Sequence, residues 1–192
     1  MSEEHRAGKG LLSLLFVGVV AIAPMIAAYT LYTFWRPTAF TNYGQLLPPT
    51  PVAGVSLGRT GGREFRLEAL KGKWVFLIVD SGTCPELCRQ RLYKMRQVRL
   101  TQGKDMDRIE RAWLIDDDAR PSGELLAEYP GMYVVRARES HLLSLLPAEA
   151  SVRDHIYVVD PLGNLMMRYP RDADPSKMKN DIARLLKLST TG

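Results

Sequence analysis

The sequence predicts an α/β domain, a mixed sheet flanked by helices, preceded by one N-terminal membrane-spanning helix. In the domain, apolar segments of strand length alternate with segments of helical spacing, and the last two strand-like segments are joined by a short turn that contains glycine. The membrane helix is predicted by the uncharged, almost wholly apolar run from Gly10 to Trp35. A chain of 192 residues is long enough for one ordinary domain and an appendage.

The composition narrows the classes of partner and cofactor. Lys and Arg number 26 and Asp and Glu number 21, which gives a net charge of +5 with both signs interspersed. This mild excess suits an acidic partner or a lipid surface, and it lacks the dense basic stripe of a nucleic-acid-binding protein. Two cysteines exclude a disulfide-stapled mini-protein and a four-cysteine zinc site. No phosphate-binding loop or dinucleotide fingerprint occurs, so no nucleotide cofactor is expected.

The apolar run has two interpretations. About 20 apolar residues cross a bilayer as a helix, so residues 11–35 are expected to form a transmembrane anchor behind a short tail, residues 1–10. The alternative is a cleaved signal peptide, because Ala21-Ile22-Ala23 has the small-x-small cleavage pattern. A retained anchor is favoured, since Pro24 would follow the cut directly and the apolar run continues beyond it.

Flanking charges predict the orientation of this anchor. Arg6 and Lys9 precede the run and only Arg36 follows it closely, so the N-terminus is expected in the cytoplasm and the domain outside it. The acidic start, with Glu3 and Glu4, is unlike an organelle transit peptide. We therefore expect a single-pass protein of a bacterial inner membrane, with a periplasmic or otherwise extracytoplasmic domain.

The remaining chain is expected to comprise a linker, residues 36–54, and one domain, residues 55–192. Pro37 to Pro51 is rich in proline and has no charge, which favours an extended linker. Strands are predicted at 65–67, 74–79, 109–115, 132–135, 156–159 and 165–169, and helices at 84–100, 121–129, 139–146 and 175–188. Crossover helices imply parallel strands and the final hairpin adds antiparallel ones, which is the thioredoxin-like arrangement.

Cys84 and Cys88 follow the apolar strand 74–79 through a short polar loop. Thr83 is expected to cap a helix that has Pro85 in its first turn, so both thiols would lie near a helix N-terminus, which favours thiolate. Residues four apart on a helix have Cβ atoms roughly 5–6 Å apart. A disulfide needs a separation nearer ~3.8 Å and therefore a bent first turn, whereas two thiolates at the wider spacing suit Cu(I). Two reduced, inert cysteines are the third possibility.

Three segments carry a resemblance to a known family. They are Leu70-Lys71-Gly72-Lys73-Trp74-Val75-Phe76-Leu77, Thr83-Cys84-Pro85-Glu86-Leu87-Cys88, and Asp154-His155 ahead of Tyr157-Val158-Val159-Asp160-Pro161-Leu162-Gly163. Together with the N-terminal anchor, they resemble the Sco/SenC family, membrane-anchored thioredoxin-fold proteins that help to assemble the copper centre of cytochrome c oxidase.

The resemblance implies roles for particular residues. Cys84 and Cys88 correspond to the family's C-x-x-x-C pair, which binds copper and can also reduce a disulfide of the oxidase subunit. The family adds a distal histidine, for which His155 is the candidate, as a metal ligand or as an ordinary histidine at the end of a strand. The family's usual spacing would select Val152 instead. His5 is expected across the membrane and His141 on a surface helix.

Three functions follow from these observations. The leading one is copper binding in oxidase assembly, with copper as cofactor and, as partners, membrane lipid and the copper-site subunit of the oxidase or another assembly factor. The first alternative is an extracytoplasmic thiol–disulfide oxidoreductase that binds no metal stably. The second alternative is a redox-inert thioredoxin-like scaffold. Nucleic acid is not expected as a partner.

Overall fold

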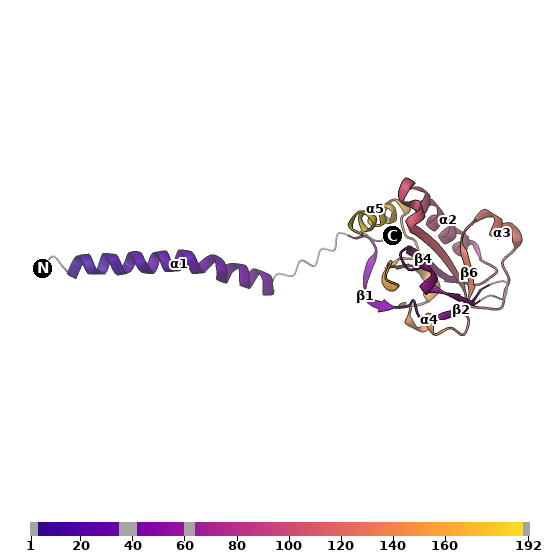
Figure 1. Ribbon diagram of the computed structural model, residues 1–192, viewed down its shortest axis with the longest axis horizontal. Coiled ribbons are helices and arrows are strands. Elements are labelled where there is room, and N and C mark those ends of the chain that lie inside the picture. Colours follow the sequence, from indigo (N-terminus) through magenta and orange to yellow (C-terminus); the bar gives the residue numbers. More distant parts are fainter. Residues whose placement is uncertain (1–3, 35–41, 60–63, 190–192) are drawn as a thin grey trace. The chain divides into compact units, whose positions relative to one another are not determined.

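The computed structural model describes residues 4–34, 42–59 and 64–189, which fall into two units divided after Thr41 (Figure 1). The first unit contains helix α1 (Glu4–Phe34). Its stretch Phe16–Thr33 is long and apolar enough to cross a membrane, and its large apolar side chains are exposed. A helix that exposes apolar side chains all round is stable in lipid rather than in water. Trp35 and residues 36–41 of the expected linker lie outside the described residues.

Within α1, polar side chains find partners in the helix itself. The Thr30 hydroxyl donates to the carbonyl of Ile26 at 2.9 Å, and the Thr33 hydroxyl donates to the carbonyl of Tyr29 at 2.8 Å. Such bonds within the helix give both hydroxyl groups a partner without help from water, as a helix that crosses a membrane requires. One N-terminal apolar helix suited to a single-pass anchor is therefore present, as the sequence predicts.

The second unit contains one mixed sheet of eight strands in the order β1-β8-β7-β4-β5-β6-β2-β3. β4 pairs in parallel with β5, and β5 in parallel with β6, while the other pairs are antiparallel. The strands are β1 (Gln45–Pro51), β2 (Ser56–Arg59), β3 (Glu64–Arg66), β4 (Trp74–Asp80), β5 (Ile109–Ile115), β6 (Tyr133–Arg136), β7 (Ile156–Val159) and β8 (Asn164–Tyr169).

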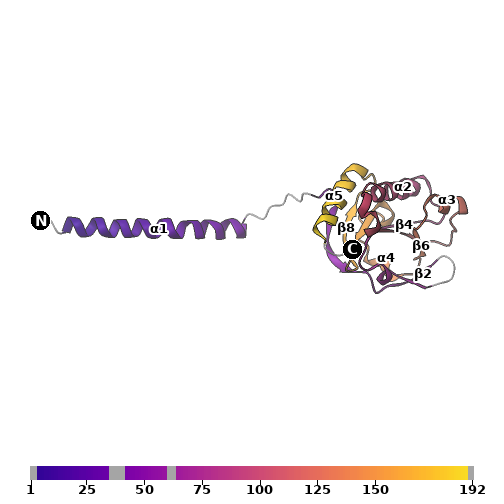
Figure 2. The same ribbon diagram turned by 45° about the horizontal axis from the view of Figure 1, so that its top comes forward.

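Helices cover both faces of this sheet. The helices and 3-10 turns described in this unit are η1 (Leu67–Leu70), α2 (Glu86–Leu100), η2 (Gly103–Arg108), α3 (Gly123–Glu128), α4 (His141–Leu145), η3 (Val152–Asp154) and α5 (Pro175–Leu188). In Figures 1 and 2, α2 and α5 lie on one side of the sheet and α4 lies on the other. Every residue of β4 is buried, because successive side chains of this central strand enter the two apolar clusters in turn. The thioredoxin-like α/β prediction is confirmed.

Part of the segment expected to be a linker forms a strand at the edge of the sheet. Strand β1 lies inside residues 36–54 and pairs with β8, Gln45 opposite Arg168, so the second unit begins near Asn42 rather than at Val55. Proline cannot donate to a ladder of strands but is tolerated at a sheet edge, and β1 is an edge strand. A proline-rich segment without alternating apolar residues therefore looks like a linker, although its residues Gln45–Pro51 form a strand. β2 was also not predicted.

Candidate functional site

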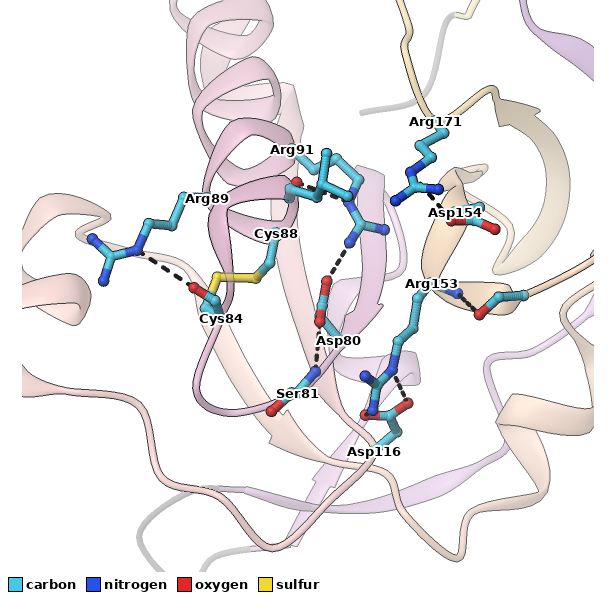
Figure 3. Close-up of polar contacts among 12 residues, drawn as sticks. Asp80, Ser81, Cys84, Cys88, Arg89, Arg91, Asp116, Arg153, Asp154 and Arg171 are labelled. Carbon is cyan, nitrogen blue, oxygen red and sulfur yellow. Dashed lines mark hydrogen bonds and ion pairs between the residues drawn. A yellow bond between two sulfur atoms is a disulfide. The ribbon is translucent and has the colours of Figure 1, made fainter.

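Cys84 and Cys88 form a disulfide at the junction between β4 and α2, with their Cα atoms 5.1 Å apart (Figure 3). The bend that such a bond requires comes from the backbone before the helix. α2 begins at Glu86 with Pro85 as its cap residue, and Cys84 has a φ of 44°, in the left-handed region that residues other than glycine rarely adopt. The expected Thr83 cap is wrong, because the Thr83 hydroxyl pairs with the Ser81 hydroxyl at 2.8 Å.

The disulfide is closed off from water. Cys84 is 1% exposed and Cys88 is 0% exposed, and both belong to the apolar cluster under α2. Between them, Leu87 is 43% exposed and Glu86 is also exposed, so the outer surface of this turn carries one apolar and one charged side chain. The sequence predicts thiolates at a helix N-terminus. The structure has the oxidised pair, and exchange with another thiol requires the turn around Cys84 to open.

The loop that carries Cys84 is held against the loop that follows β5. A Cβ atom on Gly82 would lie 2.2 Å from the carbonyl oxygen of Ala119, so only glycine allows this approach. Asp117 accepts hydrogen bonds from the backbone N–H groups of Gly82 at 3.0 Å and Ala119 at 3.1 Å. Partial burial raises the pKa of Asp117, but these hydrogen bonds and one with Ser81 outweigh it and hold the pKa below its usual value.

A buried ion pair lies beside the cysteine turn. Asp80 is 2% exposed and Arg91 is 4% exposed. The Arg91 guanidinium donates through Nη2 to Asp80 and through Nε to the carbonyl of Leu87 at 3.2 Å, while Asp80 also accepts from the N–H of Ser81 at 2.8 Å (Figure 3). Burial raises the pKa of Asp80, opposed by Arg91, and burial lowers the pKa of Arg91, opposed by Asp80. The pair joins the end of β4 to the first turns of α2.

Two further ion pairs surround this one. Arg153 binds Asp116 through two hydrogen bonds of 2.7 Å, and Arg171 lies 3.5 Å from Asp154 (Figure 3). The short helix η3 thus presents charged side chains near the end of β4. Sequence reasoning missed the Asp80–Arg91 pair. Its signals were a carboxylate directly after the apolar run 74–79 and an arginine three positions after Cys88, hence on the same face of the helix.

His155 contacts two tyrosine residues. Its Nδ1 is 3.1 Å from the carbonyl oxygen of Tyr169, and its ring meets the ring of Tyr157 edge-on. Among the described residues, no group of three or more His, Cys, Asp and Glu side chains is arranged to hold a metal ion. The structure therefore brings Cys84 and Cys88 together, and ligation by His155 stays a prediction. His141 is exposed and contacts Ser144, in keeping with a surface histidine.

Comparisons with known proteins agree on the fold. Copper-bound Sco1 from yeast is 17% identical, with a TM-score of 0.57 over 79% of this chain and 97% of that one. Apo Sco1 from Thermus thermophilus is 19% identical, with a TM-score of 0.56 over 78% and 98%. A putative thiol:disulfide interchange protein DsbE from Chlorobium tepidum is 19% identical, with a TM-score of 0.55 over 73% and 99%.

Sequence comparison is more limited. No curated protein sequence matches the chain. The family model for a transmembrane-like, thioredoxin-like, C-terminal domain matches residues 74–189, more than half of the chain. The likeness to Sco that the motifs indicate is thus confirmed in the fold, and the chain belongs to the transmembrane-like, thioredoxin-like C-terminal domain family.

Proposed function

We propose that this chain is a membrane-anchored thiol–disulfide exchange protein that works outside the cytoplasm through Cys84 and Cys88. The observation that carries the proposal is the Cys84–Cys88 disulfide in the turn between β4 and α2. Because both cysteines belong to one turn, passage between dithiol and disulfide involves the turn around Cys84. The similarity to a thiol:disulfide interchange protein supports this chemistry.

In the reducing direction, the dithiol form acts on a client disulfide. The Cys84 thiolate attacks one client sulfur, and the other client sulfur leaves as a thiolate. The Cys88 thiolate then attacks Cys84 in the mixed disulfide, which forms the Cys84–Cys88 bond and releases the second client thiolate. Two electrons pass to the client, and its thiolates take up the two protons that the cysteines release through solvent. Cys84 is assigned the first attack because it lies outside α2, ahead of its positive end.

The test uses the reduced full chain and a model peptide that contains one disulfide. The wild type should reduce the peptide, Cys88→Ser should accumulate a mixed disulfide between Cys84 and the peptide, and Cys84→Ser should do neither. Mass spectrometry under non-reducing conditions distinguishes these products. A mixed disulfide in Cys84→Ser but not in Cys88→Ser would reverse the two roles, and no reaction of the wild type would leave a redox-inert scaffold.

Copper binding in cytochrome c oxidase assembly is the second candidate. The favouring observation is that two sulfur atoms stand side by side in a fold shared with copper-bound Sco1. Once reduced, Cys84 and Cys88 offer the soft donors that Cu(I) prefers. For the third donor, the contact of His155 Nδ1 with the carbonyl of Tyr169 leaves Nε2 as the ring atom that would bind copper. The client would be the copper-site subunit of the oxidase or another assembly factor.

A copper titration of the reduced full chain checks this candidate. One Cu(I) should bind, and either Cys84→Ser or Cys88→Ser should abolish tight binding, since a single thiolate rarely holds copper against competing thiols. His155→Ala should weaken Cu(II) much more than Cu(I), because imidazole suits the oxidised ion. If the wild type retains neither Cu(I) nor Cu(II) but still reduces the peptide, the copper-binding function is rejected and the thiol–disulfide exchange function remains.

A further inference from the structure

The exposed face of α5 is basic. Its exposed charged side chains are all cations: Lys177, Lys179, Arg184 and Lys187. The one acidic residue within α5, Asp181, is buried, and the cap residue Asp174 is bound to the N–H groups of Ser176 and Lys177. Leu188, the last residue of the helix, is 83% exposed. α2, which packs beside α5, adds Lys94, which lines a hollow with Pro175, and carries the exposed Glu86 at its start. A surface of this composition is complementary to an anionic one.

The chain enters the second unit at this same helix. The Asp181 carboxylate accepts hydrogen bonds from the N–H groups of Tyr43 at 3.1 Å and Gly44 at 2.8 Å. The Lys177 ammonium lies 5.1 Å from the centre of the Tyr43 ring, and the Tyr43 hydroxyl accepts from the N–H of Asp174. The first residues of the unit are therefore fixed to α5 at two of its turns.

Covalent length limits how far this point lies from the end of α1. Phe34 and Asn42 are eight residues apart in the sequence. Eight residues span at most about 29 Å in any conformation. If α1 is the membrane anchor, a connection of this length lets α5 reach the bilayer surface. The Debye length of about 8 Å at physiological salt restricts the attraction to short range.

We infer that the basic face of α5 docks on the anionic lipid headgroups of the membrane that holds α1. The recognised chemistry is a layer of lipid phosphates, met by the α5 lysines with Leu188 at the rim. The apolar side of α5 is already buried in the domain core, so the contact is electrostatic and sensitive to salt. Docking would fix which way the Cys84–Cys88 turn faces above the bilayer. The inference rests on the anchor in the proposed function, not on its thiol chemistry.

A photo-crosslinking experiment on the full chain in lipid nanodiscs tests this inference. A benzophenone amino acid replaces Asn180, which is exposed on α5, or, as control, Leu162, which is 71% exposed in the turn between β7 and β8. Residue 180 should form lipid adducts in discs with phosphatidylglycerol. These should be lost in discs of phosphatidylcholine alone and at high salt, and residue 162 should form none in either disc.

Charge reversal supplies the matched comparison. K179E/K187E should weaken docking by at least ~30-fold, because each lysine near an anionic surface contributes roughly fivefold. K71E/R120E makes the same change in net charge at exposed residues outside α2 and α5 and should keep the adducts. Lys177 is left unchanged because it contacts Tyr43.

Three outcomes would overturn the inference. Lipid adducts could form equally in anionic and neutral discs, or they could persist in K179E/K187E. Residue 180 could also form no lipid adduct in anionic discs, which is the result expected if this surface binds an acidic protein instead. A chain that does not insert into the discs at all would overturn it together with the anchor. Peptide reduction measured on the same preparation reports on the thiol chemistry separately.

Discussion

Asp80 and Arg91 bury two opposite charges next to the Cys84–Cys88 turn. Removing one member of a buried pair strands the other charge in a medium that solvates it poorly, which costs about 3–5 kcal/mol. We therefore expect Asp80→Ala to lower the free energy of unfolding by roughly that amount. Urea denaturation of the full chain, followed by circular dichroism, measures the change.

The control for this prediction removes both charges. In D80L/R91M, two apolar side chains of similar size replace the pair, and such replacements are often neutral or stabilising. The double variant should regain most of the stability that Asp80→Ala loses. If the double variant is as unstable as the single one, the pair stabilises the end of β4 through its hydrogen bonds to Ser81 and Leu87 rather than through charge balance.

Asp117 makes the loop of Cys84 sensitive to acid. Its pKa lies below the usual 3.8 in the folded chain, so its contribution to stability is present above that value and is lost as the pH falls through the folded pKa. Asp117→Asn keeps an oxygen for Gly82 but has no charge. It should be less stable than the wild type by about 1 kcal/mol at pH 6.

Thermal melts between pH 6 and pH 2 provide the measurement. The difference between the wild type and Asp117→Asn should narrow toward zero at the acid end. A constant difference across this range would mean that the carboxylate does not titrate with the loop and that Gly82 is held by its approach to Ala119 alone.

At the residue scale, the sequence identifies the cysteines but not their surroundings. The C-x-x-x-C spacing after an apolar strand is local information, and the structure joins these two residues. The partners of Arg91, Arg153 and His155 come from segments distant in the chain, 11, 37 and 14 residues away. Tertiary packing selects such partners, and spacing within one segment shows only which face of the helix Arg91 occupies.

At the scale of elements, buried strands and amphipathic helices were predictable, and edges were not. β4 is entirely buried and reads as a continuous apolar run up to Asp80, and β5 is almost entirely buried and apolar apart from Glu110 and Arg111. β1 is an edge strand of mostly exposed residues that pairs on one side only, and its pairing depends on β8, more than 100 residues later. The start of α2 was misplaced because the left-handed backbone of Cys84 delays the helix to Glu86.

Asp181 attaches β1 to α5, and its removal should loosen this edge of the sheet. Asp181→Ala leaves the N–H groups of Tyr43 and Gly44 without their acceptor, and an unsatisfied buried donor costs about 1–3 kcal/mol. Amide hydrogen exchange should become faster in β1 and in the facing residues of β8, with β4 and β5 still protected. Asp172→Ala, at an exposed carboxylate just before α5, is the control and should leave β1 unchanged. Equal exchange in both variants would contradict the role of Asp181.

At the scale of the whole molecule, the α/β architecture was predictable because the order of elements alone restricts the topology. Parallel strands need crossover helices, and a short turn such as the one between β7 and β8 makes an antiparallel hairpin. The two-unit division also follows from composition, since no soluble core can bury an isolated helix with apolar residues on all sides. The side of the membrane on which the domain lies depends on flanking charges rather than on the fold.

That orientation gives the last prediction. Arg6 and Lys9 precede α1's apolar stretch and only Arg36 follows closely, so the domain should be exported and α1 retained. In a bacterial host, alkaline phosphatase fused after Gly192 should be active, because that enzyme needs disulfides that form outside the cytoplasm. Moving the positive charges, as R6E/K9E with two added lysines after Arg36, should reduce this activity. The intact mass of the protein in the membrane fraction checks whether α1 is retained, because a mature chain that starts at Pro24 or later would show cleavage and reject the anchor. Activity of a cytoplasmic reporter fused at the same position would show the opposite orientation.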